Sequence, residues 1–484
     1  MNYKLVINIL GKTLFICGLL LCIPLGISFI YNETHLWQSF VYPIAGLFLA
    51  GLIMILIKPE DKTILAKEGI IIVALTWVVL SLVGAVPFVV SGAIPNYVDA
   101  LFETVSGLTT TGSSVLSDVE ALPKCLLFWR SFTHFIGGMG VLVFVLAILP
   151  KSSGSMHIYR AESPGPTSSK LVSKMSFTAR ILYAIYVVLT LIQIIFYLCG
   201  GMPLFDSVLI GFSVAGTGGF AITNNGMAAY SNYAQIVATV FMFLFSINFN
   251  LYYMILIGNV KKAVKSEEFI AFTLMIVAAI TMIAINLVVS CKQVYSSFGL
   301  ALKDAAFHVT SISSTTGLSN NVDTDAWPTL AKSVLMFLMI CGAMAGSTGG
   351  GMKMARFVIL FKAGINDIKK MIRPREVTTI KFESEILSQE TVRNTYTFLS
   401  LWLALICLSA FILSFDGFDL LTNISTAFAC IGNIGPGFNE VGVLKNYANF
   451  SGFSKVYLSL LMLAGRLELF PIFIMFQPST WGKN

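Results

Sequence analysis

The sequence predicts an all-α membrane protein made of four repeated units with quasi-fourfold symmetry, preceded by an extra two-helix unit. Three observations support this prediction. Of 484 residues, 56% are hydrophobic and only 11% are charged, whereas soluble domains carry about 25% charged residues. The mean hydropathy is +0.83. Long apolar segments and a recurring short Thr/Gly motif are the second and third observations.

The apolar segments set the number of predicted membrane spans. A helix needs roughly 20 apolar residues to cross a hydrocarbon core. Ten segments approach or exceed that length. They are residues 10–31, 38–57, 69–92, 125–149, 179–202, 231–259, 268–291, 329–361, 396–414 and 454–476.

The Thr/Gly motif occurs four times, at intervals of roughly one hundred residues, which indicates an internal repeat. Each copy is a short polar turn with a central glycine. The copies read TTTGS at 109–113, AGTGGF at 215–220, STTGL at 314–318 and NIGPG at 433–437, with central glycines Gly112, Gly218, Gly317 and Gly435.

The residues around each motif also repeat. Asp99 and Asp304 stand thirteen residues before their glycines, and Asp206 stands twelve before Gly218; the fourth copy departs, with Asp419 sixteen residues before Gly435. A short apolar run follows each aspartate and is too short to span. One unit is therefore an outer helix (M1), a short pore helix, a turn and an inner helix (M2). Irregular backbone at membrane depth must be buried in protein or line water, so the four turns should share one axis.

These features divide the chain into five parts. Residues 1–60 form the two-helix unit, which lacks the motif, and the repeats occupy 61–150, 151–260, 261–365 and 366–484, the last with a polar linker. A Ser/Pro/Gly-rich loop is expected at 151–176. The polar stretch 362–393 is expected to form a helical hairpin. It is either a docking surface for a soluble partner or a solvated linker near anionic lipid.

The distribution of charge predicts the topology. The net charge is +7, and Lys and Arg gather at 58–67, 151–180, 261–265 and 353–393, alternating with loops that carry few. The positive-inside rule places these basic segments in the cytoplasm. We therefore expect a multi-pass plasma-membrane protein with both termini cytoplasmic and all four turns opening outward. Basic loops beside lipid need no nucleic-acid partner.

Enzymatic chemistry is not expected. The eight cysteines are scattered without a Cys-x-x-Cys pair, and the four histidines are dispersed. A hydrolase or transferase would require a clustered nucleophile and base or a metal-ligand set. The sequence predicts neither an enzyme nor a cofactor.

The four turns have the composition of a cation filter. A cation that leaves water must regain oxygen ligands, and backbone carbonyls aimed at an axis can supply them. Glycine permits the dihedral angles that this aim requires, and a preceding threonine adds a hydroxyl. Ile434-Gly435 lacks that hydroxyl. The candidate ligands are Thr110, Thr111, Gly112, Thr217, Gly218, Thr315, Thr316, Gly317, Asn433, Ile434 and Gly435.

A glycine-rich segment interrupts the third inner span. Four glycines occur among its six residues, and each costs about 1 kcal/mol relative to alanine in a helix. The helix should therefore break, either as a mobile polar loop that plugs and opens the path or as a packing kink. The segment comprises Gly346, Ser347, Thr348, Gly349, Gly350 and Gly351.

Two charged residues near the fourth motif have two interpretations each. Arg466 lies within an apolar span, where a charge costs roughly 2.5 to 3.5 kcal/mol, so it should face the interior with a partner. It is either an electrostatic barrier or gate latch, or a strut bonded to filter-loop carbonyls or to a carboxylate such as Glu468. Glu440 is either a cation attractor at the outer mouth or a surface charge.

Four units of this kind, each with one filter glycine, resemble the Trk/Ktr/HKT superfamily of potassium transporters, and the extra N-terminal helix pair is similar to its TrkH family. The resemblance covers the whole chain and implies K+ uptake, with K+ bound by the filter residues above and gating by the 346–351 loop with Arg466 beneath the filter. It also implies a homodimer and a cytosolic ring of nucleotide-binding (TrkA-like) subunits.

The filter departs from the Thr-Val-Gly-Tyr-Gly sequence of potassium channels, since each strand keeps one central glycine and the strands differ. Fewer ion sites and looser discrimination against Na+ are expected. An alternative function is a symporter that couples K+ to Na+ or H+ by alternating access. Four turns on one side of the membrane favour channel-like conduction instead.

Overall fold

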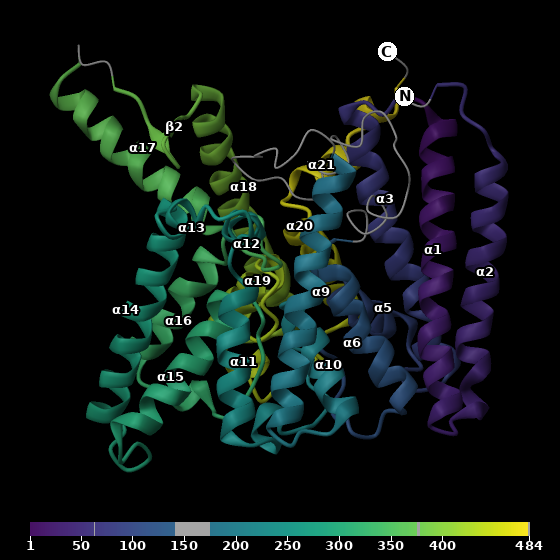
Figure 1. Ribbon diagram of the computed structural model, residues 1–484, viewed down its shortest axis with the longest axis horizontal. Helices are drawn as coiled ribbons and strands as arrows, with labels where there is room; N and C mark the ends of the chain where they lie inside the picture. The colour runs from purple at the N-terminus through teal and green to yellow at the C-terminus, as the bar shows by residue number, and fades with distance from the viewer. Residues whose placement is uncertain (62, 141–174, 375–377, 483–484) are drawn as a thin grey trace.

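The computed structural model describes the whole chain except residues 62, 141–174, 375–377 and 483–484. Its first unit is a pair of long helices, α1 (Tyr3–Ile30) and α2 (Trp37–Leu56), which stand side by side at one edge of the molecule (Figure 1). The pair packs through small residues: a Cβ added to Gly51 would lie 2.9 Å from the Gly11 carbonyl oxygen. Small residues let membrane helices approach closely.

The first repeat contains α3 (Ala66–Gly84), the short α4 (Val86–Val90), α5 (Tyr97–Leu108) and α6 (Lys124–Gly138). The Asn96 side chain caps α5 by accepting a hydrogen bond from the Val98 amide. An N-cap satisfies one of the amides that the first turn leaves unpaired.

The other repeats follow the same order of outer helix, short helix, extended strand and broken inner helix. The second contains α9 (Met175–Cys199), α10 (Leu204–Ala215), α11 (Asn232–Phe245) and α12 (Phe249–Leu256); the third contains α13 (Val260–Val264), α14 (Glu267–Ser290), α15 (Phe298–Ser313), α16 (Thr329–Cys341) and α17 (Met354–Ile372); the fourth contains α18 (Gln389–Leu413), α19 (Leu420–Ile431), α20 (Gly452–Arg466), α21 (Phe470–Phe476) and α22 (Pro478–Trp481).

The predicted inner spans are not continuous helices. Among the described residues, six helices are long and apolar enough to cross a membrane, and the α11–α12 pair, bent by 88°, is a seventh candidate. The third inner span breaks between Cys341 and Met354, and the fourth breaks after Arg466. The first ends as α6 at Gly138, and the rest of its predicted range, 141–149, lies outside the described residues. The inner helices therefore end or bend at the glycine and polar residues within each predicted apolar span.

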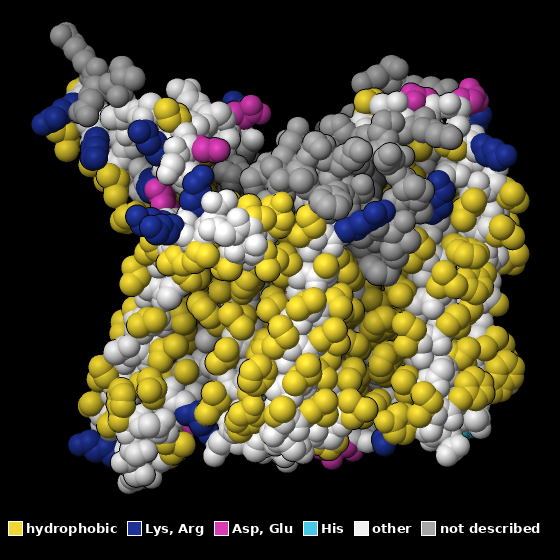
Figure 2. Space-filling view, viewed as in Figure 1, with side chains coloured by type: hydrophobic (Ala, Val, Ile, Leu, Met, Phe, Trp, Pro, Cys, Tyr) yellow, Lys and Arg dark blue, Asp and Glu magenta, His cyan; other side chains and the backbone are white. Residues whose placement is uncertain are grey.

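The surface confirms a multi-pass membrane protein. Figure 2 shows a broad hydrophobic band between the two ends of the molecule, with Lys and Arg gathered mostly at the end that carries both termini. Large apolar side chains are exposed along the outer helices, for example Leu49 at 64% and Leu274 at 64%. An apolar surface this large would make a soluble protein aggregate, whereas in a membrane protein it is the surface that contacts lipid.

The polar linker differs from the predicted helical hairpin. α17 ends at Ile372, and an antiparallel ribbon of β1 (Lys381–Phe382) and β2 (Glu385–Ile386) follows before α18 begins at Gln389. Pro374 lacks the amide hydrogen that would continue α17, and Glu383 and Ser384 turn the ribbon at φ of 50° and 66°. The predicted loop at 151–176 lies outside the described residues up to 174.

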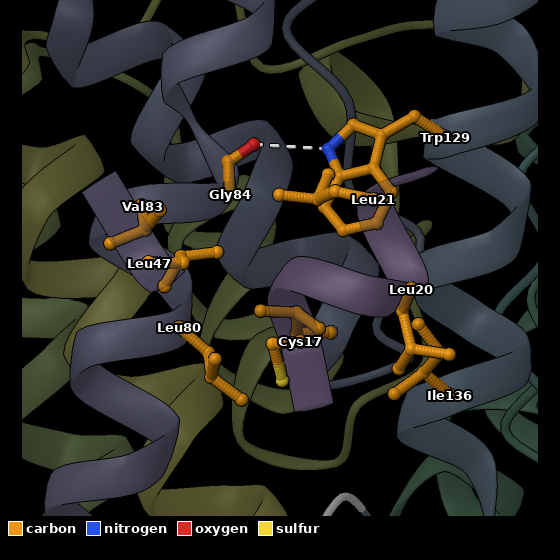
Figure 3. A pocket seen from close by; sticks show the side chains of 10 residues that line it. Cys17, Leu20, Leu21, Leu47, Leu80, Val83, Gly84, Trp129 and Ile136 are labelled. Atoms are coloured by element: carbon orange, nitrogen blue, oxygen red, sulfur yellow. Dashed lines mark hydrogen bonds between the residues drawn. The ribbon is translucent and has the colours of Figure 1, made fainter. Parts of the chain in front are cut away.

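The two-helix unit contacts the first repeat through apolar packing. Figure 3 shows the small pocket at this junction, where Cys17 and Leu20 from α1 and Leu47 from α2 face Leu80 and Trp129 of the repeat. The one hydrogen bond drawn there runs from the Trp129 indole nitrogen to the Gly84 carbonyl at 3.0 Å.

We predict that Gly51→Leu destabilises the two-helix unit, because the new side chain would collide with the α1 backbone at Gly11. Overpacking of this kind costs about 1–3 kcal/mol. Gly46→Leu is the matched control on the same helix, since no atom lies within 4 Å of its added Cβ. The melting temperature of the purified protein should fall for Gly51→Leu alone; equal melting temperatures for both variants would contradict this packing.

Candidate functional site

The strands that follow the four short helices meet around one axis. In each strand one glycine lies so close to a carbonyl oxygen of the next strand that an added Cβ would come nearer than 3.0 Å. The contacts run from the first repeat to the second, third and fourth and back to the first, so the ring is closed. The pairs are Gly112 with Gly218, Gly219 with Thr316, Gly317 with Ile434, and Gly435 with Thr111.

The backbone dihedrals repeat in the same register. The residue two positions before each ring glycine is left-handed: φ is 54° at Thr110, 54° at Thr217, 59° at Thr315 and 53° at Asn433. Positive φ is unfavourable for β-branched threonine. The following amide donates to the carbonyl five residues earlier, at 2.8 to 2.9 Å, in all four copies. The left-handed residue therefore ends each short helix and redirects the chain into the strand.

The predicted register of the second copy is wrong by one residue. Gly219, with φ of 77°, is the equivalent of Gly112, Gly317 and Gly435, and Gly218 supplies a ring carbonyl instead. A Cβ on Gly218 would meet the His134 ring, which explains the second glycine. The aspartate spacing contained the signal: Asp206 stands thirteen residues before Gly219, as Asp99 and Asp304 do before theirs.

Most carbonyls of the four strands have no hydrogen-bond partner. Among the described residues, none donates a hydrogen bond to the carbonyl oxygens of residues 110–112, 217–219, 315–317, 433 or 434. The Gly435 carbonyl differs, because it accepts from Tyr447 at 2.7 Å and from Ser113 at 3.3 Å. Buried carbonyls are almost always paired, so a ring of open ones has oxygen atoms available to coordinate a cation.

The threonine hydroxyls do not all lie as expected. The Thr111 and Thr316 hydroxyls contact the hydroxyls of Thr109, at 2.8 Å, and Ser314, at 2.7 Å, at the ends of their own helices. The Thr217 hydroxyl donates to the adjacent Gly216 carbonyl. The oxygen atoms of the strands that have no hydrogen-bond partner are therefore mainly backbone carbonyls, together with the side-chain oxygen of Asn433.

A buried ion pair behind the strands was missed by sequence reasoning. Arg130 on α6 and Glu103 on α5 lie 2.6 Å apart. Glu103 also accepts from the Val115 amide at 2.9 Å, and Arg130 donates to the Ala221 carbonyl at 2.7 Å. The pair thus joins the outgoing strands of the first two repeats. In the sequence Glu103 and Arg130 each stand in a mostly apolar helix, 27 residues apart, so no local pattern predicts that they pair.

A cavity of about 170 Å³ lies on one side of the ring and is lined by residues that include Gly112, Gly219, Gly317 and Gly435. Its walls are the segments that follow the strands, at the end of the molecule opposite the termini (Figure 1). Lys445 lines this cavity and pairs with Glu440 at 2.9 Å, and this hydrogen bond raises the pKa of Lys445. The negative charge of Glu440 is therefore paired with the positive charge of a lysine at the cavity wall.

The glycine-rich segment lies against the other end of the ring. The Gly350 amide donates to the Thr315 hydroxyl at 2.6 Å, and the Thr348 hydroxyl donates to the Phe245 carbonyl at 3.1 Å. A Cβ on Gly349 would lie 2.7 Å from the Ser314 carbonyl oxygen. The break predicted at 346–351 is thus a non-helical loop directly beneath the strands.

Arg466 joins this loop to the first repeat. Its guanidinium donates to the Thr348 carbonyl at 2.8 Å, to the Thr110 hydroxyl at 3.2 Å, and to the carbonyls of Gly137 and Gly138 at 2.6 Å each. The sequence predicted filter-loop carbonyls or Glu468 as strut partners; the carbonyls that accept from Arg466 belong instead to Thr348 of the glycine-rich segment and to the end of α6.

Further buried charges surround the loop and were not predicted. Glu468 pairs with Arg356. The buried Lys353 ammonium donates to the Gly349 carbonyl. Lys353 and Arg466 thus both donate to carbonyls of the loop, while Arg356 is paired with Glu468.

The two ends of the loop are held together by one carboxylate. Glu268, in the first turn of α14, accepts from the Ala345 amide at 2.7 Å and the Ala355 amide at 3.0 Å. Phe382 of the ribbon packs in a small apolar cluster with Ala355 and Ala345. The Glu383 carboxylate accepts from the Glu268 amide at 3.1 Å. The ribbon therefore packs beside the residues that flank the loop.

Comparison with known proteins agrees with this architecture. A family model described as the cation transport protein TrkH matches residues 42–483. The Trk system potassium uptake protein TrkH of Vibrio parahaemolyticus is 32% identical, over 99% of this chain and 100% of its own length. TrkG of Escherichia coli K12 is 29% identical, over 99% of each chain. The crystal structure of the potassium transporter TrkH from Vibrio parahaemolyticus matches with a TM-score of 0.88 and 30% identity over 100% of both chains. This chain belongs to the TrkH family of cation transport proteins.

Proposed function

We propose that this chain takes up K+ across the plasma membrane by channel-like conduction through the four converging strands. The observation that carries the proposal is the closed ring of carbonyl oxygens without hydrogen-bond partners. Such oxygens replace the hydration shell of an alkali cation. The relatives named as potassium uptake proteins support K+ as the ion.

The dipoles of the four short helices favour a positive ion at the ring. Each ends directly at its strand, so the negative ends of α5, α10, α15 and α19 lie beside the ring. A helix C-terminus carries roughly half a negative charge. Together they lower the energy of a cation at the inner end of the filter.

The loop at 346–351 with Arg466 is the proposed gate. It lies across the inner end of the ring and brings the Arg466 guanidinium against Thr110 and Thr348. A fixed positive charge there opposes a cation on the axis. Conduction therefore requires that the loop and Arg466 move away from the strands.

The topology and partners complete the proposal. Both termini and the basic surface occupy one end (Figure 2), which we assign to the cytoplasm by the positive-inside rule. A cytosolic nucleotide-binding subunit would act on this end, where the ribbon packs beside the residues that flank the gate loop, and two copies of the chain would form a homodimer. Coupling of K+ to Na+ or H+ is the alternative.

Liposomes that contain the purified protein test the proposal and its alternative. We expect K+ and Rb+ flux that follows the imposed potential, with an initial rate independent of a Na+ or H+ gradient. A rate that requires either gradient would favour coupled symport, and the absence of K+ flux would contradict K+ conduction.

We predict that Gly219→Ala abolishes K+ flux, because its new methyl group would collide with the Thr316 carbonyl of the next strand. Gly201→Ala is the matched control. It has the same left-handed backbone, with φ of 79° against 77°, but no atom lies within 4 Å of its added Cβ. Both variants bear similar backbone strain of about 1 kcal/mol, so only contact with the ring separates them. Equal flux from the two variants would argue against this ring.

We predict that Arg466→Gln raises the flux of the purified protein without a partner, because it removes the charge beneath the filter. Arg466→Lys separates the two roles considered for this residue. If the charge is the barrier, the lysine variant should conduct as the wild type does; if the forked hydrogen bonds latch the loop, both variants should conduct more. Reduced flux in both variants with normal folding would make Arg466 a strut and not a gate.

We also predict that Glu268→Leu raises unstimulated flux, because it frees the amides of Ala345 and Ala355 at the two ends of the loop. Glu267→Leu is its matched control: the neighbouring carboxylate pairs with Lys362 at 2.5 Å and is half-exposed. The same liposome assay reads both variants, and unchanged flux for Glu268→Leu would mean that these two bonds do not hold the gate closed.

A further inference from the structure

The outer end of the filter breaks the quasi-fourfold symmetry at one carbonyl. The Gly435 carbonyl oxygen accepts hydrogen bonds from the Tyr447 hydroxyl at 2.7 Å and the Ser113 hydroxyl at 3.3 Å. Its equivalents at Gly112, Gly219 and Gly317 accept no hydrogen bond from the described part of the chain. At this level three carbonyls are open and the fourth is occupied.

Tyr447 is held firmly where it makes this bond. Its side chain is buried, and its own amide donates to the Ser114 carbonyl at 2.8 Å. Its ring centroid lies 5.4 Å from that of Phe102 and 5.5 Å from that of Phe450. The segment after the fourth strand therefore crosses to the first repeat and presents the hydroxyl from a packed position on the wall of the outer cavity.

Ser113 is the second donor and is peculiar to the first strand. The equivalent residues after the other ring glycines are Phe220, Leu318 and Pro436, none of which has a hydroxyl. Ser113 thus reaches across the junction between the first and fourth repeats to the Gly435 carbonyl. Both donors come from this one junction, so the asymmetry is local.

We propose that Tyr447 and Ser113 determine cation selectivity at the outer end of the filter by withholding the Gly435 carbonyl from the ion. This inference rests on the proposed K+ conduction. Selectivity for K+ over Na+ depends on the number and field strength of coordinating carbonyls. With three open carbonyls at this level, the cation keeps part of its hydration shell there, and the preference for K+ is weaker than a complete ring would give.

The test is the double variant Tyr447→Phe/Ser113→Ala, which removes both donors and keeps the phenyl ring. Purified protein in liposomes is compared for K+, Rb+, Na+ and Li+ flux. The freed carbonyl should raise the K+ to Na+ permeability ratio about fivefold, the value of roughly one net hydrogen bond. Tyr447→Phe alone should give a smaller rise in the same direction.

Two controls isolate the effect. Tyr457→Phe removes a tyrosine hydroxyl that bonds the Ser409 hydroxyl at 2.8 Å, between α18 and α20, and not a strand carbonyl, so it should keep the wild-type ratio. Ser113→Thr retains a hydroxyl donor and should also keep that ratio. A change in Tyr457→Phe equal to that in the double variant would mean that any lost hydroxyl alters permeation, and would overturn the inference.

The failures of the two proposals are distinguishable. Wild-type protein that carries no K+ would overturn the proposed function. Wild-type K+ flux with an unchanged ratio in the folded double variant would overturn only the role of Tyr447 and Ser113, and so would an equal loss of flux for all four cations. If the double variant does not elute as folded protein, the ratio in Tyr447→Phe decides by the same criterion.

Discussion

The structure depends on the close approach of each ring glycine to a carbonyl of the neighbouring strand. Four such contacts close a ring in which no β-carbon fits. The approach leaves the ring carbonyls without protein partners, which is costly unless a cation or water satisfies them. Three threonines and an asparagine in left-handed conformation deliver the strands to this ring, and the surrounding protein must hold that strain.

The shell around the ring is less symmetric than the ring. The first two strands are joined by the Arg130–Glu103 pair, whereas the third and fourth are joined where the Asp325 carboxylate accepts from the Asn439 amide at 3.1 Å. Each junction between repeats thus has its own polar chemistry. A chain that repeats within one polypeptide can vary each junction separately, which a homotetramer cannot, so ligand number can differ along the axis.

The loop at 346–351, on the side of the ring nearer the termini, is attached to the protein mainly by hydrogen bonds rather than by packed side chains. The loop is bonded to Thr315, Arg466 and Glu268, yet its glycines lack side chains that would pack it permanently. Most of its bonds are single hydrogen bonds, each worth about 1 kcal/mol net. The proposed cytosolic partner would need only a few kcal/mol of differential affinity between the two loop positions to shift such an equilibrium.

The sequence by itself determined the membrane class, the repeat, the short helices and the break at residues 346–351, because hydropathy, helix caps and clustered glycines act locally. It did not determine the second-copy register, since Gly218 and Gly219 are adjacent and only contact with Thr316 or His134 separates their roles. Nor did it reveal the ribbon's packing beside the loop or the bond from Tyr447 to Gly435. Those depend on which distant segments pack together, and only the tertiary structure decides that.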